Sequence, residues 1–464
     1  MAGVTTRTQA DSAIQRHEAA VAAIRQAYAE IPAGQQIRLA KSTSNLFRFR
    51  ADGTGAGLDV SEFGGVICID PDEKTARVGG MTTYEDLVAA TLRYGLMPLV
   101  VPQLKTITIG GAVSGLGIES TSLRNGMPHE SVIALEILTG DGRVVTATRD
   151  NEHAALYRGF PNSYGTLGYT LSLTIELEPV RPYVHLRHFR FTDPEACFAA
   201  VADVAAQGSY RGHRADFIDG TAFSVDEMYL TIGAFSDVAP WRSDYTGDRV
   251  YYQSIRGPKE DFLTIADYLW RWDTDWFWCS RPFGVQRPGV RRLWPRRYRR
   301  SDVYRKLVAL DRKYAVTSKL AAIQGRSQRE MVVQDVEIPA DNSATFLRYF
   351  LSEVGMTPVW MCPLRLRGDL TWPLYPMQPG QVYVNFGFWG TVPLPPGAAD
   401  GHFNRQIEDK VTELGGHKGL YSTAFYSRDE FWARYNGTEY AQLKRAYDGQ
   451  GRLADLYDKC VRGV

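Results

Sequence analysis

The chain has 464 residues, 44% of them hydrophobic and 23% charged, which is enough for two or three domains and is typical of a globular protein. The formal net charge of +1 gives no overall field that would attract nucleic acid, so we expect no nucleic-acid partner. The five scattered cysteines include no C-x-x-C pair, and the sequence has no signal peptide and no apolar run of 18 residues, which argues against a metal site, a disulfide framework and a membrane span and favours the cytoplasm.

The first 180 residues alternate between predicted helices and strands. Apolar residues at helical spacing predict a helix over residues 11–31, and short strands are expected at 36–40, 66–70 and 75–78. Thr82 and Glu85 have the spacing of a capping box, which predicts a helix that ends near Gly95. Residues 132–138 and 143–148 form a predicted hairpin, and 171–177 is a further strand. This mixture favours an α+β fold over a doubly wound sheet.

Pro179 and Pro182 mark a boundary, and the elements beyond it predict a sheet with helices on one side. Asp193 followed by Pro194 is typical of a helix start, and residues 228–235, 331–338 and 382–388 read as strands. A second helix is expected near Asp341, and a third runs from residue 402 to the glycines at 415–416. Two more helical pieces close the chain.

A glycine-rich stretch, residues 102–122, is the feature around which the chain is organised. Its four glycines permit positive φ and let the main chain approach a ligand closely. The exposed N–H groups, with nearby threonine and serine hydroxyls, suit a pyrophosphate and a polar ring edge. The spacing fits neither the G-x-G-x-x-G fingerprint nor the P-loop, and a plain glycine-rich turn is the alternative.

The order of segments around this stretch resembles the FAD-binding half of the vanillyl-alcohol-oxidase/p-cresol-methylhydroxylase (PCMH) flavoprotein superfamily. A Lys-Ser-Thr-Ser-Asn-Leu loop precedes it at 41–46, and an Asn-Ser-Tyr-Gly-Thr-Leu-Gly segment follows at 162–168. Residues 108–120, 420–422 and 427–432 look like the Δ24-sterol reductase (seladin/diminuto) branch. Residues 272–281 and 293–300 look like the actinobacterial flavoenzymes that reduce 10-methylene-stearoyl chains to 10-methyl-stearoyl chains in tuberculostearic acid biosynthesis.

The resemblance implies three parts: a PCMH-type FAD-binding domain over residues 1–180, an α+β cap or substrate domain over 181–400, and a C-terminal helical segment, 401–464, that returns to the flavin. It also implies NADPH as the reductant. The first loop lacks the histidine or cysteine that links flavin covalently in some relatives, so we expect dissociable FAD. The residues expected to contact FAD are Lys41, Ser42, Thr43, Ser44, Asn45, Leu46, Pro102, Gln103, Thr106, Thr108, Ile109, Gly110, Gly111, Ser114, Gly115, Gly117, Ile118, Glu119, Ser120, Gly165, Thr166 and Gly168.

Four elements offer candidate catalytic residues. Residues 362–367 look like a strand with Arg365 and Arg367 on one face, where sugar-oxidising relatives carry an arginine near the flavin; Pro363 stands where those relatives have an acidic residue, which weakens the oxidase interpretation. The loop at 415–418 lies where relatives place a histidine or lysine beside the ring, although a histidine at a helix C-terminus is also simply favoured by the dipole. The candidates are Arg365, His417, Lys418 and Tyr421, with Gln334 or Asp335 as a fourth element unless these strand residues are solvated.

Residues 268–300 hold five of the ten tryptophans and nine arginines. The tryptophans could be core residues, the arginines a solvated face, and the two together a partner interface; stacking on nucleic acid is disfavoured because the rest of the chain is neutral. Tryptophan and arginine also suit the boundary between water and lipid. We therefore expect peripheral attachment to the inner face of an anionic membrane, with a lipid methyltransferase as a further possible partner.

The function that these observations favour is FAD-dependent reduction of an isolated carbon–carbon double bond in a lipid by NADPH, above all the 10-methylene group of a methylene-branched acyl chain. A Δ24-sterol-type side-chain reductase is the first alternative. An alcohol or sugar oxidase and a flavin- or lipid-binding protein without turnover follow it.

Overall fold

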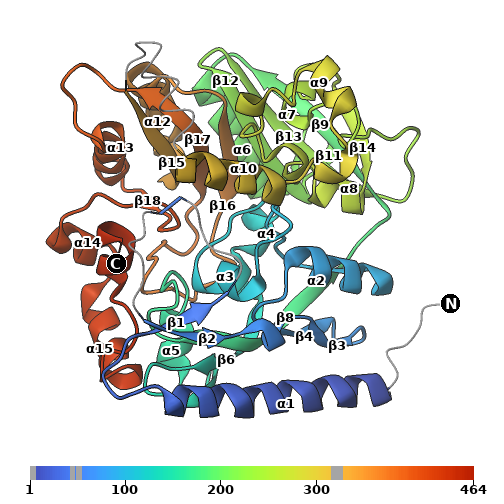
Figure 1. Ribbon diagram of the computed structural model, residues 1–464. Helices are drawn as coiled ribbons and strands as arrows, with labels where there is room; N and C mark the ends of the chain where they lie inside the picture. Colours follow the sequence, from blue (N-terminus) through green and yellow to red (C-terminus); the bar gives the residue numbers. More distant parts are fainter. Residues whose placement is uncertain (1–6, 42–46, 49–54, 315–327, 464) are drawn as a thin grey trace.

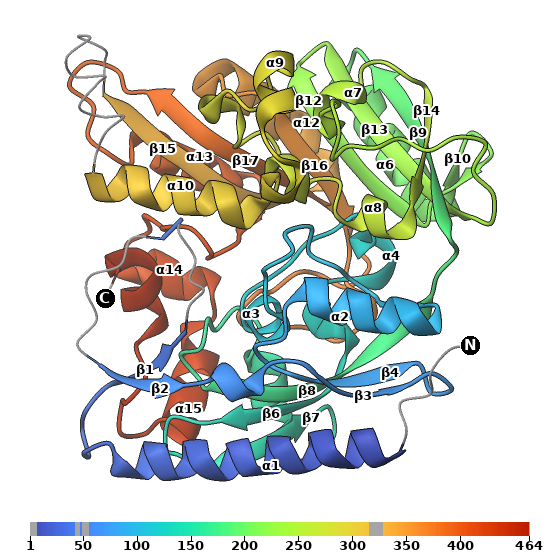
Figure 2. The same ribbon diagram turned by 45° about the vertical axis from the view of Figure 1, so that its right-hand side comes forward.

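The computed structural model describes residues 7–41, 47–48, 55–314 and 328–463, and it places one sheet above another (Figures 1 and 2). The lower sheet comes from residues 66–179 and the upper sheet from residues 183–418. The change of sheet falls between β8 and β9, where the two prolines predicted a boundary. The end of the chain, with α14 (Arg428–Arg434) and α15 (Gly437–Tyr447), runs back down beside the lower part, so the two expected terminal helices are confirmed.

The lower sheet is antiparallel, in the order β3–β4–β8–β6–β7, with β5 also paired to β8. Helix α1 (Arg7–Glu30) packs beneath it because Ile24 and Tyr28 join Leu138 and Leu171 in one buried cluster. The strands are β3 (Val66–Asp70), β4 (Thr75–Gly79), β5 (Leu96–Pro98), β6 (Val132–Leu138), β7 (Val144–Thr148) and β8 (Tyr169–Pro179). The remaining elements of this part are the parallel pair β1 (Ile37–Ala40) and β2 (Ala56–Asp59) and the helices α2 (Tyr84–Thr91), α3 (Ile109–Ser114), α4 (Ser122–Asn125) and α5 (Ala154–Gly159).

The upper sheet is antiparallel and follows the order β14–β9–β13–β12–β16–β17–β15–β18. Its strands are β9 (Tyr183–Phe191), β12 (Phe217–Ser224), β13 (Glu227–Ser236), β14 (Glu260–Thr264), β15 (Arg329–Pro339), β16 (Val359–Leu364), β17 (Tyr383–Pro393) and β18 (His417–Lys418), and a separate small hairpin is formed by β10 (Ser209–Tyr210) and β11 (His213–Arg214). The α+β class and the large antiparallel sheet are therefore confirmed.

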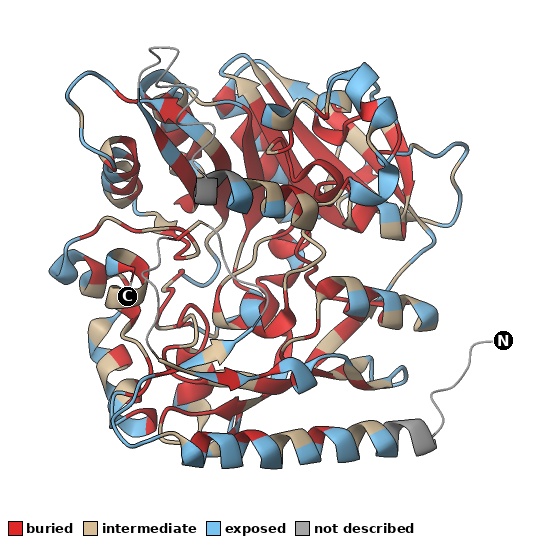
Figure 3. Cartoon of the chain, in the orientation of Figure 1, coloured by how far each residue is buried: buried red, intermediate tan, exposed pale blue. Residues whose placement is uncertain are grey.

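Three helices, α6 (Pro194–Gln207), α12 (Ser343–Tyr349) and α13 (His402–Glu413), pack on one face of the upper sheet. Successive strand residues point to opposite faces, so Val336 and Phe386 bury against Phe346 and Ile407 on this face, which we call the outer face. Figure 3 colours most of the strands of the upper sheet as buried, and the three helices contribute buried residues to the same cluster. The start of α6 follows its predicted cap, because the Asp193 side chain accepts a hydrogen bond from the main chain three residues later.

The opposite, inner face of the upper sheet turns toward the lower part and is also covered by residues 245–310. This segment contains α7 (Tyr251–Ser254), α8 (Ile265–Leu269), α9 (Pro288–Leu293) and α10 (Ser301–Tyr314). The expected arrangement, with helices on one side only, thus holds for α6, α12 and α13 but not for these four. Alternation along the strands gives the inner face its own set of residues, including Trp360 and Trp389.

Two local predictions were wrong. Thr83, not Thr82, caps α2 by accepting from Asp86 N at 3.2 Å, because the Thr82 hydroxyl is buried and donates to the main-chain oxygen of Gly79. Strand β16 ends at Leu364, so the arginines at 365 and 367 lie beyond the strand on which they were expected. No helix in the described part of the chain is both long and apolar enough to cross a membrane.

Candidate cofactor and active site

The glycine-rich stretch folds into a loop and the short helix α3, whose first turn is capped by Thr108. The Thr108 hydroxyl accepts from Gly111 N at 3.3 Å. Gly110 N donates to Gly80 O at 2.9 Å, and a Cβ on Gly110 would lie 2.6 Å from that oxygen. None of the four glycines at 110, 111, 115 and 117 has positive φ, so that expectation was wrong. The stretch needs glycine at position 110 for close main-chain packing instead.

The Asn-Ser-Tyr-Gly segment that follows β7 and α5 in sequence is hydrogen-bonded to this stretch. Tyr164 N donates to Ser114 O at 2.8 Å, and Asn162 N donates to Gly115 O at 3.0 Å. A Cβ on Gly115 would lie 3.2 Å from the Tyr164 ring and 2.9 Å from a main-chain oxygen. The glycine-rich stretch (residues 102–122) and the Asn-Ser-Tyr-Gly segment therefore form one unit, which we call the glycine-rich unit. Here Gly165 and Gly168 do have positive φ, at 78° and 149°.

The residues just after the first loop join the same unit. Lys41 follows β1 directly, whereas Ser42, Thr43, Ser44, Asn45 and Leu46 lie outside the described residues. Arg48 is buried, and its guanidinium lies 4.7 Å from the centroid of the Tyr164 ring. Phe47 lies 6.1 Å from Tyr421, ring to ring. Phe47 and Arg48 thus lie between the glycine-rich unit and Tyr421, one of the candidate catalytic residues.

Several buried polar atoms in this unit have no hydrogen-bond partner among the described residues. Gln103 is 2% exposed, and neither of its side-chain polar atoms is bonded. Three more buried atoms have no hydrogen-bond partner among the described residues: the Ser163 hydroxyl, the Asn162 Oδ1 and the Tyr164 hydroxyl. Buried polar groups are normally satisfied, so this cluster fits the pyrophosphate and polar ring edge of FAD.

Other predicted FAD contacts are engaged within the protein. Glu119 accepts from Gln103 N at 2.8 Å, Ser120 accepts from the Tyr268 hydroxyl at 2.9 Å, and the Thr166 hydroxyl donates to Ser163 O at 2.7 Å. These three side chains hold the loop in shape. Pro102, Thr106, Ile118 and Gly117 lie in the same stretch, with Gly117 packed so that a Cβ would lie 2.9 Å from Pro128. The contact of all these residues with FAD stays a prediction.

The inner face of the upper sheet carries a polar group beside Tyr421. Asp335 on β15 accepts from Asn385 Nδ2 on β17 at 3.1 Å and from the Tyr421 hydroxyl. That hydroxyl accepts from Trp389 Nε1 at 2.8 Å. Burial raises the pKa of Asp335 to about 6, and the hydrogen bonds from Asn385 and Tyr421 oppose the rise. Burial and the Asp335 charge raise the pKa of Tyr421 well above its usual value.

A second acidic group lies two residues along the same strand. Glu337 is fully buried, its two oxygens have no partner among the described residues, and burial raises its pKa well above the ordinary value. It pairs across the strands with His417, whose ring lies 5.4 Å from that of Tyr375. Burial, helped by the charge of Arg434, lowers the pKa of His417 to about 4. His417 is thus a half-buried neutral imidazole on a strand rather than an exposed loop histidine.

The structure does not bring the other candidates to this group. Lys418 points to the outer face, where its ammonium meets Glu408 on α13 at 2.5 Å and is fully buried. Gln334 also faces α13 and donates to Asn404 at 2.7 Å. Arg365 donates to Ala205 O at 3.3 Å, and Arg367 is paired with Glu176. Alternation along β15 and β18 separates Gln334 and Lys418 from their neighbours Asp335 and His417.

Sequence reasoning missed Asn385, Trp389, Phe47 and the role of Glu337. Asn385 in the mostly apolar strand β17 and Glu337 among the apolar residues at the end of β15 were the signals that could have found two of them, since a polar residue on a buried strand needs a reason. Phe47 and Trp389 reach Tyr421 only through the tertiary fold. The aromatic wall beside Tyr421 also includes Trp276, 5.6 Å from Phe47 ring to ring, and Phe277, 4.4 Å from Trp389.

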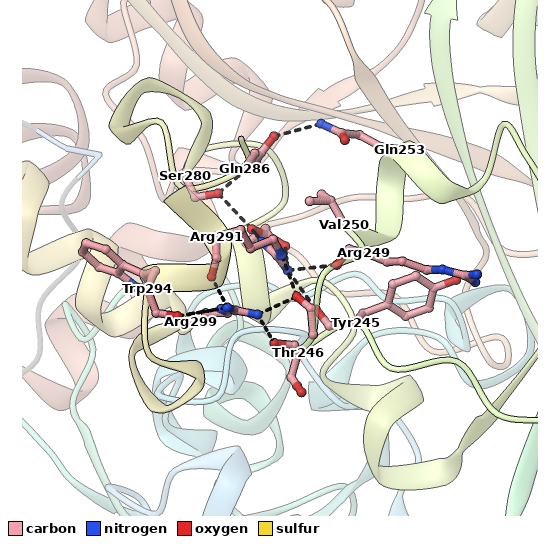
Figure 4. Close-up of polar contacts among 12 residues, drawn as sticks. Tyr245, Thr246, Arg249, Val250, Gln253, Ser280, Gln286, Arg291, Trp294 and Arg299 are labelled. Carbon is pink, nitrogen blue, oxygen red and sulfur yellow. Dashed lines mark hydrogen bonds and ion pairs between the residues drawn. The ribbon is translucent and has the colours of Figure 1, made fainter. Parts of the chain in front are cut away.

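Residues 268–300, which we call the Trp/Arg-rich segment, are largely packed into the protein and do not form an exposed face. Trp272, Trp276 and Trp278 are buried. Arg291 is also buried and meets Asp275 at 2.7 Å. Figure 4 shows Arg291 and Arg299 joining the loop at 245–249 to residues 291–294, because both guanidiniums donate to main-chain oxygens. The expectation that these arginines face lipid was wrong for Arg271, Arg291 and Arg299, which are all buried.

Comparisons with known proteins agree with this picture. A family model described as an FAD binding domain matches residues 13–148. The Delta(24)-sterol reductase of Mus musculus is 25% identical over 436 residues, which cover 86% of this chain and 76% of that protein. The corresponding figures for the Arabidopsis thaliana Delta(24)-sterol reductase are 25% over 450 residues, 88% and 76%. Cytokinin dehydrogenase 6 of Oryza sativa subsp. japonica is 32% identical over 115 residues, 25% of this chain and 22% of that protein. The chain is therefore an FAD-linked oxidoreductase with an N-terminal FAD-binding domain and distant homology to Delta(24)-sterol reductases.

Proposed function

We propose that the protein uses NADPH and FAD to reduce an isolated carbon–carbon double bond in a lipid. The preferred substrate is the 10-methylene group of a methylene-branched fatty acyl chain carried by a phospholipid. The observation that carries this proposal is the Asp335 group: a carboxyl with a pKa of about 6, held against an aromatic wall beside the glycine-rich unit. Such a group supplies a proton to an apolar substrate.

The reaction adds one hydride and one proton across the double bond, and NADPH becomes NADP⁺. Gln103, Asn162 and Ser163 would hold FAD, and the bound cofactor would supply the hydride-transfer chemistry that links NADPH to one alkene carbon. Asp335 gives the proton to the other carbon and is left as a carboxylate. Hydrogen bonds from Asn385 and the Tyr421 hydroxyl stabilise that carboxylate, which is why both favour proton release. An alkene without a neighbouring carbonyl is a weak base, so a proton donor fixed in a dry site is required.

The test is anaerobic incubation of the FAD-loaded protein with NADPH and a methylene-branched phospholipid, followed by mass analysis of the released acyl chains. We expect a gain of two mass units with unlabelled reagents. Labelled nicotinamide and deuterated water should each supply one deuterium, and together they should raise the gain to four. A flavin that NADPH does not bleach would exclude a reductase, and bleaching by an alcohol instead would indicate an oxidase. Bleaching by neither would leave a binding protein.

The second candidate is a Δ24-sterol-type side-chain reductase, which the 25% identity to the Mus musculus and Arabidopsis thaliana reductases favours. It uses the same hydride and proton transfers, so the Asp335 group serves it equally well. A sterol with an unsaturated side chain and the methylene phospholipid, offered together in one vesicle, separate the two. The sterol candidate requires consumption of the sterol in preference to the acyl chain.

We also propose that the protein attaches to an anionic membrane through the tip of α9, a smaller surface than the whole Trp/Arg-rich segment. Leu293 is 86% exposed there, with Val290 also exposed. Arg287 and Arg292 are exposed around them. An apolar side chain ringed by cations suits a surface of anionic headgroups, at about 1 kcal/mol per basic residue.

Replacing Leu293 and Arg292 with serine should therefore weaken sedimentation with phosphatidylglycerol vesicles, and raised salt should weaken the wild type in the same direction. NADPH-driven bleaching in solution should persist. Val225→Ser, an exposed apolar residue at the turn between β12 and β13, is the matched control. If the double variant sediments as the wild type does, the α9 tip serves another purpose, and docking of the methyltransferase that would make the methylene lipid is the next hypothesis.

A further inference from the structure

A cavity of about 290 Å³ lies between the glycine-rich stretch and the Trp/Arg-rich segment, and none of the Asp335 group lines it. Its walls come from the lead-in to α3, from α8 and from the turn that follows α9. Six cationic side chains and one carboxylate, that of Asp267, line it, although the whole chain has a net charge of only +1. They are Lys105, Arg271, Arg296, Arg297, Arg299 and Arg300.

Four of the six cations are held by carboxylates of the protein. Lys105 and Arg300 share a single carboxylate, Glu85, at 3.4 and 2.7 Å. Arg300 also contacts Asp302, Arg296 meets Asp244 at 3.0 Å, and Arg271 meets Asp219 at 2.7 Å. These pairs shape the wall and offset its charge at those positions.

The other two cations have no carboxylate partner in the described part of the chain. The buried guanidinium of Arg299 donates only to main-chain oxygens, among them those of Gly247 and Trp294. Burial, followed by the charges of Arg291 and Arg296, lowers the pKa of Arg299. Carbonyl dipoles satisfy its hydrogen bonds but do not cancel its charge, so this wall of the cavity keeps a positive potential.

Arg297 is the second uncompensated cation. It is exposed, and its guanidinium lies 4.8 Å from the centroid of the Tyr298 ring, so it is free to turn toward a ligand. Trp270 presents a half-buried ring to the cavity, 5.9 Å from the Lys105 ammonium. Guanidinium groups match phosphate oxygens in pairs, and an aromatic face accepts a sugar or a base.

We propose that this cavity binds a phosphate ester carried by one of the two substrates, the pyridine dinucleotide or the phospholipid headgroup. Only that choice of ligand rests on the proposed function; the anion site itself does not. A neutral ligand would leave Arg297 and Arg299 uncompensated, and a cation would be repelled by them. A phosphate supplies negative charge to both and hydrogen-bond acceptors to Arg297.

The test measures binding of inorganic phosphate to the FAD-loaded protein by calorimetry, with chloride at the same ionic strength as the reference. The wild type should bind phosphate saturably, and Arg297→Gln should weaken binding about tenfold, as loss of one charge-assisted contact does. This change is safe for folding because Arg297 is exposed and its one contact within the described ranges is with the Tyr298 ring. Arg445→Gln, on the exposed side of α15 across the molecule, is the control and should bind as the wild type does. Equal binding by Arg297→Gln and wild type, or equal loss in the control, overturns the site.

Kinetics then identify the source of the phosphate. If the dinucleotide occupies the cavity, Arg297→Gln raises the half-saturating NADPH concentration for flavin bleaching and leaves that of the phospholipid unchanged. If the headgroup occupies it, Arg297→Gln raises the half-saturating concentration of the phospholipid and leaves that of NADPH unchanged. If neither concentration changes, the assignment of the cavity to a substrate is refuted. Because phosphate binding is measured without turnover, failure of the anion site and failure of the proposed reaction remain distinguishable.

Discussion

Asp335→Asn should slow alkene reduction by about 10²–10⁴-fold, the usual contribution of a general acid. Asparagine keeps the shape of the carboxyl and its contact with Asn385 but cannot give up a proton. NADPH-driven bleaching of the flavin should be unchanged, because hydride transfer to the cofactor needs no protein acid. The measurement is single-turnover reduction of the methylene lipid by pre-reduced protein. Asp341→Asn, exposed just beyond the same strand, is the matched control.

The pH dependence provides an independent check. The proton donor is the protonated form, so turnover by the wild type should fall as pH rises through the pKa of Asp335 at about 6. Tyr421→Phe removes a hydrogen bond that favours the carboxylate, so the pKa should rise and the limb of the profile should move to higher pH. Its rate loss should be smaller than that of Asp335→Asn. Normal turnover by Asp335→Asn at every pH would move the donor elsewhere, with Glu337 the next residue to test.

Gly111→Val should abolish retention of FAD, so that the purified variant is colourless and acid precipitation releases no flavin. Gly111 is exposed in the first turn of α3, and among the described residues only the Thr108 hydroxyl lies within 4 Å of a Cβ built there, at 2.9 Å. That hydroxyl has to shift, so thermal unfolding of the variant is compared with that of the wild type. A folded variant without flavin would show that the branched side chain blocks approach of the main chain to the cofactor. The same acid treatment of the wild type should release its FAD into the supernatant, because the attachment is non-covalent.

The control for this glycine is Gly368→Val, where a Cβ meets nothing within 4 Å and φ is not positive. It should keep the flavin and the yellow colour. Gly115→Val is a weaker test, because its side chain would also strike the Tyr164 ring and a main-chain oxygen, so a loss of FAD there would not separate binding from folding. Wild-type FAD retention by a folded Gly111→Val would show that the stretch is only a turn.

The sequence was most informative where function and chain order coincide. The glycine-rich stretch ends at Ser122 and the Asn-Ser-Tyr-Gly segment begins at Asn162, so residues 123–161 lie between them. The hydrogen bonds of Tyr164 to Ser114 and of Asn162 to Gly115 nevertheless join them, as their order in the chain suggested. Strand alternation explains why His417 and Lys418 point to opposite faces of the upper sheet. The register of β18 on β15, which places His417 opposite Glu337, depends on long-range pairing that no local pattern shows. The sequence alone leaves open that Asp335 is a solvated carboxylate at the surface. Only the fold shows that Asn385 and Tyr421 donate hydrogen bonds to it.

Arginine was the residue type for which sequence reasoning failed most. The amino-acid composition does not distinguish Arg291 and Arg299 from Arg297. The first two are buried and donate hydrogen bonds to main-chain oxygens, whereas Arg297 is exposed. Guanidinium groups can satisfy several carbonyls at once, so a run of arginines indicates a structural joint as readily as a charged surface. The prediction that Arg365 lies on a strand was wrong for a different reason, because β16 ends at Leu364, one residue earlier.

The return of the chain end has a consequence for how the protein is made. The Lys459 ammonium donates to Tyr164 O at 2.7 Å, the Lys444 ammonium donates to Thr166 O at 2.8 Å, and Arg48 donates to Cys460 Sγ at 3.0 Å. Lys444, Lys459 and Cys460 all follow the glycine-rich stretch by more than 300 residues in the sequence. A nascent chain that contains every glycine of the cofactor loop but not yet residues 444–460 therefore lacks these contacts, and the loop gains them only when that later segment has been made and has folded back.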